Sequence, residues 1–161
     1  MPPVTLCGYG RCVPQPKTTR IFIAEDSDFL RDLLMRSLAA IPGVAVVGNA
    51  CSGDAAIAGV RNLRPDIVLL DLAMPQGGGF AVLETLKPDG QRPFFLVLTM
   101  HTEAAFRDQC RELGAHVFLD KTTEIQRLLD ALQELAGRDF DLPDLLEAFL
   151  PEQQTVERTK I

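Results

Sequence analysis

The sequence is short of several features that would assign it to large functional classes. Basic residues are in the minority, with 16 Lys and Arg against 22 Asp and Glu and a net charge of −6. This balance does not favour nucleic acid, which attracts basic proteins. No apolar run is long enough for a membrane helix, and the N-terminus lacks the apolar stretch of a signal peptide. We therefore expect a cytoplasmic protein with no direct binding to DNA or membranes.

Cysteine motifs are also missing. None of the four cysteines belongs to a CxxC pair; they are Cys7, Cys12, Cys51 and Cys110. Cys7 and Cys12 lie close together, but no second pair or histidine cluster is placed to complete a zinc site. The expected state is four free thiols, as is usual in cytosolic proteins.

The remaining composition suits one domain with extra length at both ends. Of the 161 residues, 47% are apolar, which is enough for a core. Residues 1–19 contain four prolines and two glycines, so we expect a flexible N-terminal extension there. We place the domain over residues 20–137 and a C-terminal tail over residues 138–161.

Apolar strands alternate with helical patterns through the domain. Continuous apolar runs of strand length occur at 21–24, 44–47, 67–70, 94–98 and 117–119. Each is followed by apolar residues at helical spacing. Runs without polar alternation are typical of strands covered on both faces, and alternation with helices predicts a parallel sheet. We therefore predict an α/β fold, a doubly wound parallel sheet with helices on both sides.

Polar residues follow these strands where they end. Glu25 and Asp26 follow the first, Asp71 the third, Thr99 ends the fourth, and Lys121 lies just after the fifth. Each has an ordinary explanation alone, such as a helix cap for Asp26 or a turn for Asp71. Parallel strands bring their carboxyl ends to one edge, however, where ligands bind in such sheets. We expect the five side chains to gather there.

A gathering of three carboxylates needs positive charge. Two carboxylates about 4 Å apart repel by roughly 4 kcal/mol at an effective dielectric of 20, and one lysine cannot balance three of them. A set of oxygen ligands without histidine or cysteine favours Mg²⁺. Mg²⁺ beside a lysine, a hydroxyl and a carboxylate nucleophile suits phosphoryl transfer. Asp71, at the end of the central apolar run, is the best candidate for the nucleophile.

Over residues 20–137 the sequence resembles the receiver domains of bacterial response regulators. The resemblance rests on Glu25-Asp26, on DLAMPQGGG from Asp71 to Gly79, on Leu98-Thr99 and on Leu119 to Lys121, all in order and at the right spacing. It implies a flavodoxin-like (βα)5 fold with strand order 2-1-3-4-5. Within this family, the sequence pattern is most similar to the subfamily that usually carries a C-terminal helix-turn-helix. Only about two dozen residues follow the fifth helix, so we expect no such module.

The resemblance implies a role for each site residue. Asp71 is the expected phosphoacceptor. Glu25, Asp26, Asp71 and the backbone carbonyl of Ala73 are the expected ligands of Mg²⁺. Lys121 and Thr99 are expected to bind the phosphoryl group, and Phe118 has the position of the aromatic switch residue, for which the alternative is a plain core residue.

Three positions depart from the commonest family pattern. Thr122 replaces the proline that usually follows the lysine, which removes the usual reason for a cis peptide there. Ala73 cannot orient a water molecule for hydrolysis, and Met100 stands where many receivers have a small residue. Slow dephosphorylation is therefore expected, unless His101 orients the water instead.

The expected function is a stand-alone receiver that is not an enzyme beyond its own phosphoryl chemistry. Its partners would be a histidine kinase or histidine phosphotransfer protein and a downstream protein target. That target would bind the face of the fourth helix, fifth strand and fifth helix, or the tail. A homodimer is an open alternative, as is a receiver fold that binds partners without phosphorylation. An aspartate-nucleophile phosphatase is disfavoured, since Ala73 stands where its second acid should be.

The tail contains one further helical pattern. From Leu142 onward, apolar residues recur at three, four, seven and eight positions, which is the spacing of one helical stripe. We expect a helix over residues 143–150, with Asp141 or Leu142 at its cap and Pro143 in the first turn. So short a helix needs a surface to pack on. It either packs on its own domain or binds a partner or a second copy of the chain.

Overall fold

The structure, a computed structural model, describes residues 17–149. Five strands and six helices form within this range. The strands are β1 (Thr19–Ala24), β2 (Val44–Ala50), β3 (Ile67–Leu70), β4 (Phe94–Thr99) and β5 (Val117–Asp120). The helices are α1 (Asp28–Ala39), α2 (Gly53–Leu63), α3 (Gly78–Leu86), α4 (Ala104–Glu112), α5 (Ile125–Leu135) and α6 (Leu142–Ala148).

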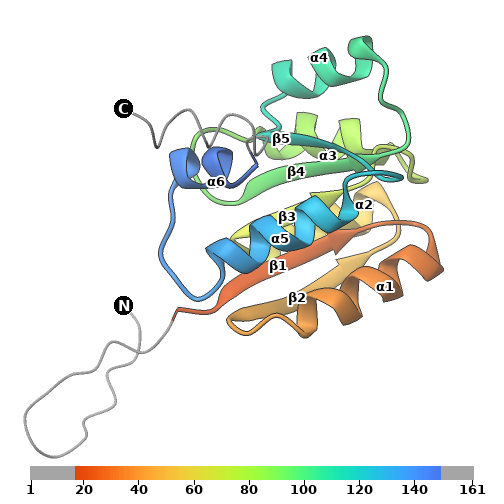
Figure 1. Ribbon diagram of the computed structural model, residues 1–161. Coiled ribbons are helices and arrows are strands. Elements are labelled where there is room, and N and C mark those ends of the chain that lie inside the picture. The colour runs from red at the N-terminus through yellow and green to blue at the C-terminus, as the bar shows by residue number, and fades with distance from the viewer. Residues whose placement is uncertain (1–16, 150–161) are drawn as a thin grey trace, which may run out of the picture.

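All five strands are parallel and form one sheet in the order β2-β1-β3-β4-β5 (Figure 1). This order confirms the predicted doubly wound fold. The central strand β3 is buried at every residue, as its unbroken apolar sequence predicts. The chain reverses its direction of winding between β1 and β3, the kind of place where such sheets bind ligands.

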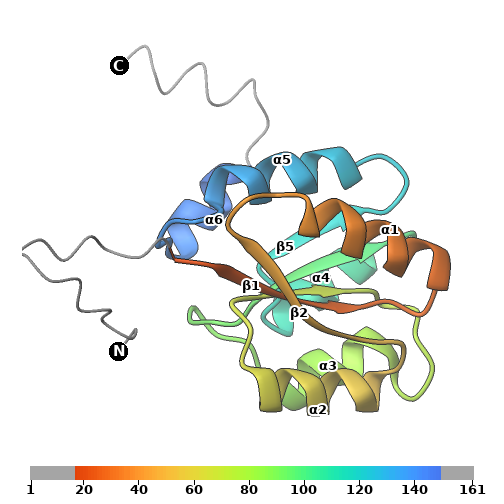
Figure 2. The ribbon, with the colours of Figure 1, turned by 90° about the horizontal axis from the view of Figure 1, so that it is seen from below.

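Helices cover both faces of the sheet (Figure 2). One apolar core lies between the sheet and α1, α5 and α6; Leu34, Leu128 and Leu145 are among its buried residues. A second core lies between the other face and α2, α3 and α4, and includes Ala56 and Leu83. The two cores fix the sheet from both sides, so the loops at its edges start from well-defined positions.

The observed elements differ from the predicted ones mainly at their ends. β1 begins at Thr19, one residue before the domain boundary that we placed at residue 20. Residues 1–16, with Cys7 and Cys12, and residues 150–161 lie outside the described residues. Ser52 caps α2 by accepting a hydrogen bond from the Ala55 amide. Ser27 caps α1 by accepting a hydrogen bond from the Leu30 amide, so Asp26 is not needed as a helix cap.

The helix predicted in the tail is α6, and it packs on its own domain. Asp141 caps it, and Asp141 and Asp144 accept hydrogen bonds from each other's backbone amides. Phe140, Leu145 and Phe149 are at most 6% exposed and belong to the core beneath α1 and α5. Of the two interpretations of the tail, the structure favours the one in which this segment adds to the fold.

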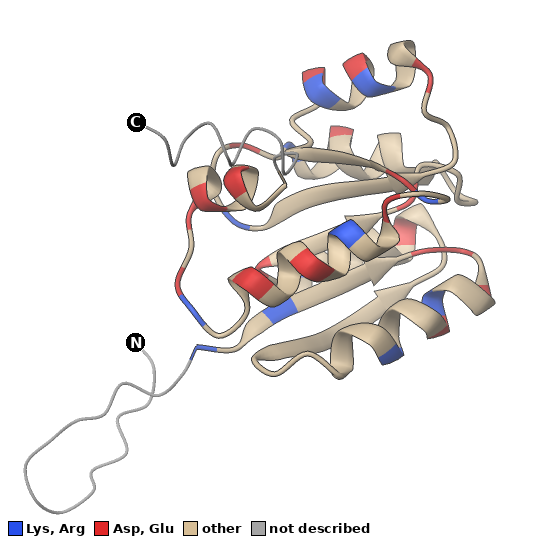
Figure 3. Cartoon of the chain, viewed as in Figure 1, with Lys and Arg blue, Asp and Glu red and all other residues tan. Residues whose placement is uncertain are grey.

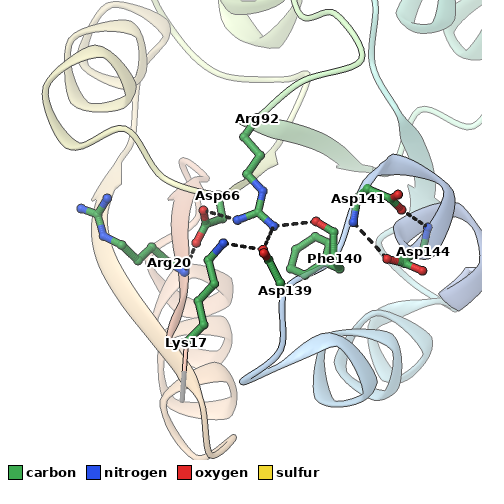
Figure 4. A network of polar contacts seen from close by, with 8 residues as sticks. All are labelled: Lys17, Arg20, Asp66, Arg92, Asp139, Phe140, Asp141 and Asp144. Carbon is green, nitrogen blue, oxygen red and sulfur yellow. Dashed lines mark hydrogen bonds and ion pairs between the residues drawn. The ribbon is translucent and has the colours of Figure 1, made fainter. Parts of the chain in front are cut away.

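A chain of polar contacts fastens the segment before α6 to the amino ends of the strands (Figure 4). Arg92 Nη1 donates to Asp66 Oδ1 at 2.8 Å, and Arg92 Nη2 donates to the carbonyl of Phe140 at 2.6 Å. The guanidinium of Arg92 also lies 4.7 Å from the centre of the Phe140 ring. Lys17 Nζ donates to Asp139 at 2.6 Å. Arg92 therefore joins β3, β4 and the α5–α6 connection at one point.

Two further expectations can be compared with the described residues. Cys51 is exposed and Cys110 is buried, and both are free thiols, as expected. Among residues 17–149 the helices are all too short or too polar to cross a membrane.

Candidate functional site

The predicted site residues do meet at the carboxyl edge of the sheet. The backbone ladder continues one residue past the strands: the Glu25 amide donates to Ala50 at 2.9 Å, and the Asp71 amide donates to Ala24 at 2.9 Å. The Lys121 amide donates to the Thr99 carbonyl at 2.9 Å. These bonds fix the starting points of the side chains. Figure 3 shows acidic residues along the connection from β1 to α1 at this edge.

Three carboxylates form the acidic cluster. One oxygen from each of Glu25, Asp26 and Asp71 lies within 4.8 Å of the others. Glu25 and Asp71 are 2% and 3% exposed, whereas Asp26 faces solvent. At this separation each pair repels by about 3 kcal/mol at an effective dielectric of 20. The cluster therefore requires positive charge nearby.

Lys121 supplies part of that charge. Its Nζ lies 3.0 Å from Asp71 Oδ2, 2.9 Å from Glu25 Oε1 and 2.8 Å from Glu25 Oε2. Burial opposes the charge on Lys121, but the hydrogen bonds to Glu25 and Asp71 outweigh it and raise the lysine pKa. Burial raises the pKa of Glu25 to about 7, with Asp71 adding to the rise and Lys121 opposing it. One lysine thus leaves the cluster short of positive charge.

Backbone amides hold the two buried carboxylates in place. The Ser27 amide donates to Glu25 Oε1 at 3.1 Å, and the Ala73 amide donates to Asp71 Oδ1 at 3.2 Å. The glycine-rich turn packs tightly behind Asp71, since a Cβ at Gly79 would lie 2.5 Å from the Asp71 carbonyl oxygen. The turn can approach this closely only with glycine there. Sequence analysis did not identify the Ser27 amide or the Lys121–Glu25 pair, because no side-chain pattern signals them.

The cluster suits a divalent cation with oxygen ligands. Two carboxylates are fixed in the protein, and the exposed Asp26 leaves the cluster open to solvent. No histidine or cysteine belongs to the cluster, which favours Mg²⁺ or a similar hard ion. The carboxylates of Glu25, Asp26 and Asp71 therefore fit the predicted metal site.

The remaining predicted residues lie on the α4 side of the site. Thr99 is fully buried, and its Oγ1 accepts a hydrogen bond from the His101 amide at 3.1 Å. The guanidinium of Arg107 lies 5.0 Å from the centre of the partly buried Phe118 ring. The His101 ring is tilted against Phe106, with 5.6 Å between ring centres. Thr99 and Phe118 thus lie on the neighbouring strands β4 and β5, and α4 contacts this region through Arg107.

Two of the departures from the family pattern can be described further. Met100 is 68% exposed. Among the described residues, the single cis peptide is Arg92–Pro93, so the Lys121–Thr122 peptide is trans. The absence of proline at residue 122 explains this, because a cis peptide before any other residue costs about 3 kcal/mol.

Comparison with known proteins decides the family. The sequence matches the response regulator receiver domain family over residues 21–133, which includes every predicted site residue. The chain is a receiver domain. Its most specific feature, an acidic pair after β1 with an aspartate after β3 and a lysine after β5, is the arrangement on which the resemblance rested.

Individual relatives agree with this family. The receiver is 41% identical over 103 residues to a protein-glutamate methylesterase/protein-glutamine glutaminase from Anaeromyxobacter dehalogenans strain 2CP-C, covering 63% of this chain and 30% of that protein. It is 29% identical over 140 residues to the response regulator GacA from Pseudomonas aeruginosa, covering 83% of this chain and 65% of that protein. The chain thus spans less than two thirds of these curated relatives.

A solved structure supports the fold. The signal receiver domain of the response regulator NarL from Mycobacterium tuberculosis matches with a TM-score of 0.68 and 30% identity. The match covers 76% of this chain and all of that one. The receiver fold is therefore shared over most of the described residues.

Proposed function

We propose that this receiver accepts a phosphoryl group on Asp71 from a histidine kinase or histidine phosphotransfer protein. The observation that carries the proposal is the position of Asp71. It is a buried carboxylate at the end of the central strand, it contacts Lys121, and it belongs to the acidic cluster. A nucleophile in this position has a cation beside it to stabilise the charge of an incoming phosphoryl group.

The transfer needs little covalent chemistry from the protein. A carboxylate oxygen of Asp71 bonds to phosphorus while the bond from phosphorus to the imidazole nitrogen of the donor histidine breaks. The electron pair of that bond returns to the imidazole. Lys121 interacts with the phosphoryl oxygens as charge builds on them. Glu25, Asp26, Asp71 and the backbone carbonyl of Ala73 would hold Mg²⁺, which would neutralise the remaining charge on the phosphoryl oxygens.

Phosphorylation changes what Thr99 can bind. Its hydroxyl oxygen already accepts from the His101 amide, and its hydroxyl hydrogen is available to donate to a phosphoryl oxygen. Drawing Thr99 toward the phosphoryl group opens space for Phe118, which moves inward and leaves Arg107. A shift from 1:99 to 99:1 requires about 5.5 kcal/mol, to which the charge-assisted bonds of Lys121 and Thr99 contribute.

The change in conformation acts by altering a binding surface and not by catalysing a further reaction. The face of α4, β5 and α5 contains Phe118 and Arg107, and we infer that it presents the signal to a downstream protein or to a second copy of the chain. Apart from its own phosphorylation and hydrolysis, the chain acts without enzymatic activity, in the cytoplasm. α6 supports the fold, so the tail is the less favoured output surface.

Labelling of matched variants tests the proposal. Purified chain is incubated with acetyl phosphate or a phosphorylated histidine kinase, in Mg²⁺ or in EDTA. Base-labile phosphate should appear on the wild-type chain in Mg²⁺ and be absent from Asp71→Asn. A wild-type chain that takes up no phosphate from either donor would instead support a receiver fold that binds partners without phosphorylation. Labelling of Asp71→Asn at the wild-type level would overturn the assignment.

A further inference from the structure

A cavity lies at the opposite edge of the sheet from the acidic cluster. It has a volume of about 630 Å³ and lies among the ends of α2 and α3, the residues before β3 and the start of β4. Its lining includes Asp66 and Pro93, which come just before β3 and β4, whereas Asp71 and Thr99 lie at the far ends of those strands. The volume falls within the range of small-molecule sites.

Positive charge dominates the lining of this cavity. Four cations line it together with two carboxylates; the cations are Arg61, Arg64, Lys87 and Arg92. The carboxylate of Asp66 is paired with Arg92 at 2.8 Å. Asp89 Oδ1 accepts from the Gln91 amide at 2.7 Å. Both carboxylates are therefore engaged within the protein, in a chain whose net charge is −6.

Three of the cations are not engaged. Within the described residues, the side chains of Arg61, Arg64 and Lys87 form no hydrogen bond or ion pair. Arg92, by contrast, is held by Asp66 and by the carbonyl of Phe140 (Figure 4). The cavity thus combines one fixed wall with three unpaired cations, although six ion pairs form elsewhere within the described residues.

The backbone at two of these cations is unusual. Arg64 and Lys87 follow the last turns of α2 and α3 with φ of 47° and 49°, in the left-handed region. Glycine is the residue that usually ends a helix in this conformation, because a side chain there is strained. Both helix ends carry a long cation instead, and both line the same cavity.

The floor of the cavity, which is its side toward the core, is apolar, and part of its wall is fixed. The lining residues Val60, Leu86 and Phe95 belong to the second apolar core. On one side the loop after α3 is held by His116, whose Nδ1 accepts from the Phe95 amide at 2.9 Å and whose Nε2 donates to the Asp89 carbonyl. A preformed apolar floor with cations around it favours a ligand that has a flat apolar part and an anionic group, since guanidinium groups bind phosphate and stack on rings.

We propose that this cavity binds a small phosphate monoester with a ring, of about the size of a mononucleotide. Arg61, Arg64 and Lys87 hold the phosphate, and the ring lies on the floor beside Arg92. The site is separate from Asp71 and needs no metal. The helix dipole also favours a cation near the end of a helix. This effect by itself, however, does not explain why the cations surround one cavity.

An NMR titration of the full chain tests the proposal. AMP is added in EDTA, so that metal bridging at the acidic cluster does not contribute. Amide signals of the non-proline residues within 61–66 and 86–93 should shift and saturate with a dissociation constant below about 1 mM. Inorganic phosphate and adenosine should each bind at least about tenfold more weakly, since each lacks half of the recognised chemistry.

Two double variants separate this site from general surface charge. Arg61→Gln with Lys87→Gln should weaken AMP binding by about tenfold or more, because two charge-assisted contacts are lost. Arg36→Gln with Arg111→Gln is the matched control, since these exposed arginines lie in the last turns of α1 and α4, outside the cavity. It should bind AMP as the wild type does. Equal weakening in both variants, shifts spread over the surface, equal binding of inorganic phosphate, or no saturation would overturn the proposal.

Discussion

Lys121 Nζ lies 3.0 Å from Asp71 Oδ2, although fifty positions separate the two residues in the sequence. The same nitrogen contacts Glu25, so one cation bridges two carboxylates that are almost completely buried. The positive charge of Lys121 offsets the cost of burying these two carboxylates, because a buried charge without a partner strongly destabilises the folded protein. The lysine therefore stabilises the two carboxylates within the protein itself.

Replacing this lysine should make the fold depend on the metal. Lys121→Gln leaves Glu25 and Asp71 facing each other, and we expect a loss of about 3 kcal/mol in the free energy of unfolding in EDTA. Mg²⁺ should restore most of this loss, since it supplies the missing charge. Urea unfolding with and without Mg²⁺ measures both effects. Lys87→Gln is the control, at an exposed lysine that has no partner within residues 17–149, and it should change stability by less than about 0.5 kcal/mol. Equal losses in EDTA and Mg²⁺ would argue against this role.

Asp26 should contribute to metal binding without contributing to the fold. It is the exposed member of the cluster, so Asp26→Asn should weaken Mg²⁺ binding by about tenfold while leaving the melting temperature nearly unchanged. Calorimetric titration with Mg²⁺ measures the affinity. Asp32→Asn, at an exposed acid of α1 outside the cluster, is the matched control. An identical titration for Asp26→Asn and wild type would remove Asp26 from the site.

Dephosphorylation should be slow because residue 73 has no polar side chain. Placing one there with Ala73→Asn should speed the loss of phosphoryl from Asp71 by about tenfold or more, since positioned polar groups contribute that much to such steps. The decay of phosphorylated chain after removal of the donor gives the rate. His101→Ala provides the comparison: its ring lies against Phe106, and we expect the rate to stay the same. A large fall in His101→Ala would show that the histidine orients the water.

Helix α6 should behave as part of the domain. Leu145 is fully buried and Leu146 is 43% exposed, so two adjacent leucines form a matched pair. Leu145→Ala should lower the free energy of unfolding by about 2–5 kcal/mol, and Leu146→Ala by less than about 1 kcal/mol. Chemical unfolding of the two variants measures the difference. If Leu145→Ala were as stable as Leu146→Ala, α6 would not be packed on the core in solution.

The acidic cluster could be predicted because strand ends are easy to locate. Four of the five strands end in, or just before, a residue that differs sharply from the apolar run, as Leu70 does before Asp71. Parallel strands then bring those residues to one edge without any knowledge of side-chain packing. The helix α6 was predictable for a similar reason, since Asp141 and Pro143 mark its start and its apolar spacing is regular.

The arrangement of side chains at the opposite edge of the sheet could not be predicted. Arg64 and Lys87 end their helices in a conformation that the sequence usually signals with glycine, so their positions gave no warning. Arg92 meets Asp66 and Phe140 only because separate segments converge there. The start of β1 at Thr19 was missed because Thr19 and Arg20 interrupt the apolar pattern that marked the strand. Contacts of this kind depend on how separate segments pack in three dimensions, and no local pattern encodes them.

Asp71 is the residue that we expect to carry the phosphoryl group. Chain treated with acetyl phosphate and Mg²⁺ is reduced with borohydride, which converts an aspartyl phosphate to homoserine, and the peptides are analysed by mass spectrometry. We expect homoserine at position 71 and at no other aspartate, with none formed in EDTA. Conversion at Asp26 with position 71 unchanged, or no conversion at all in fully folded protein, would contradict it.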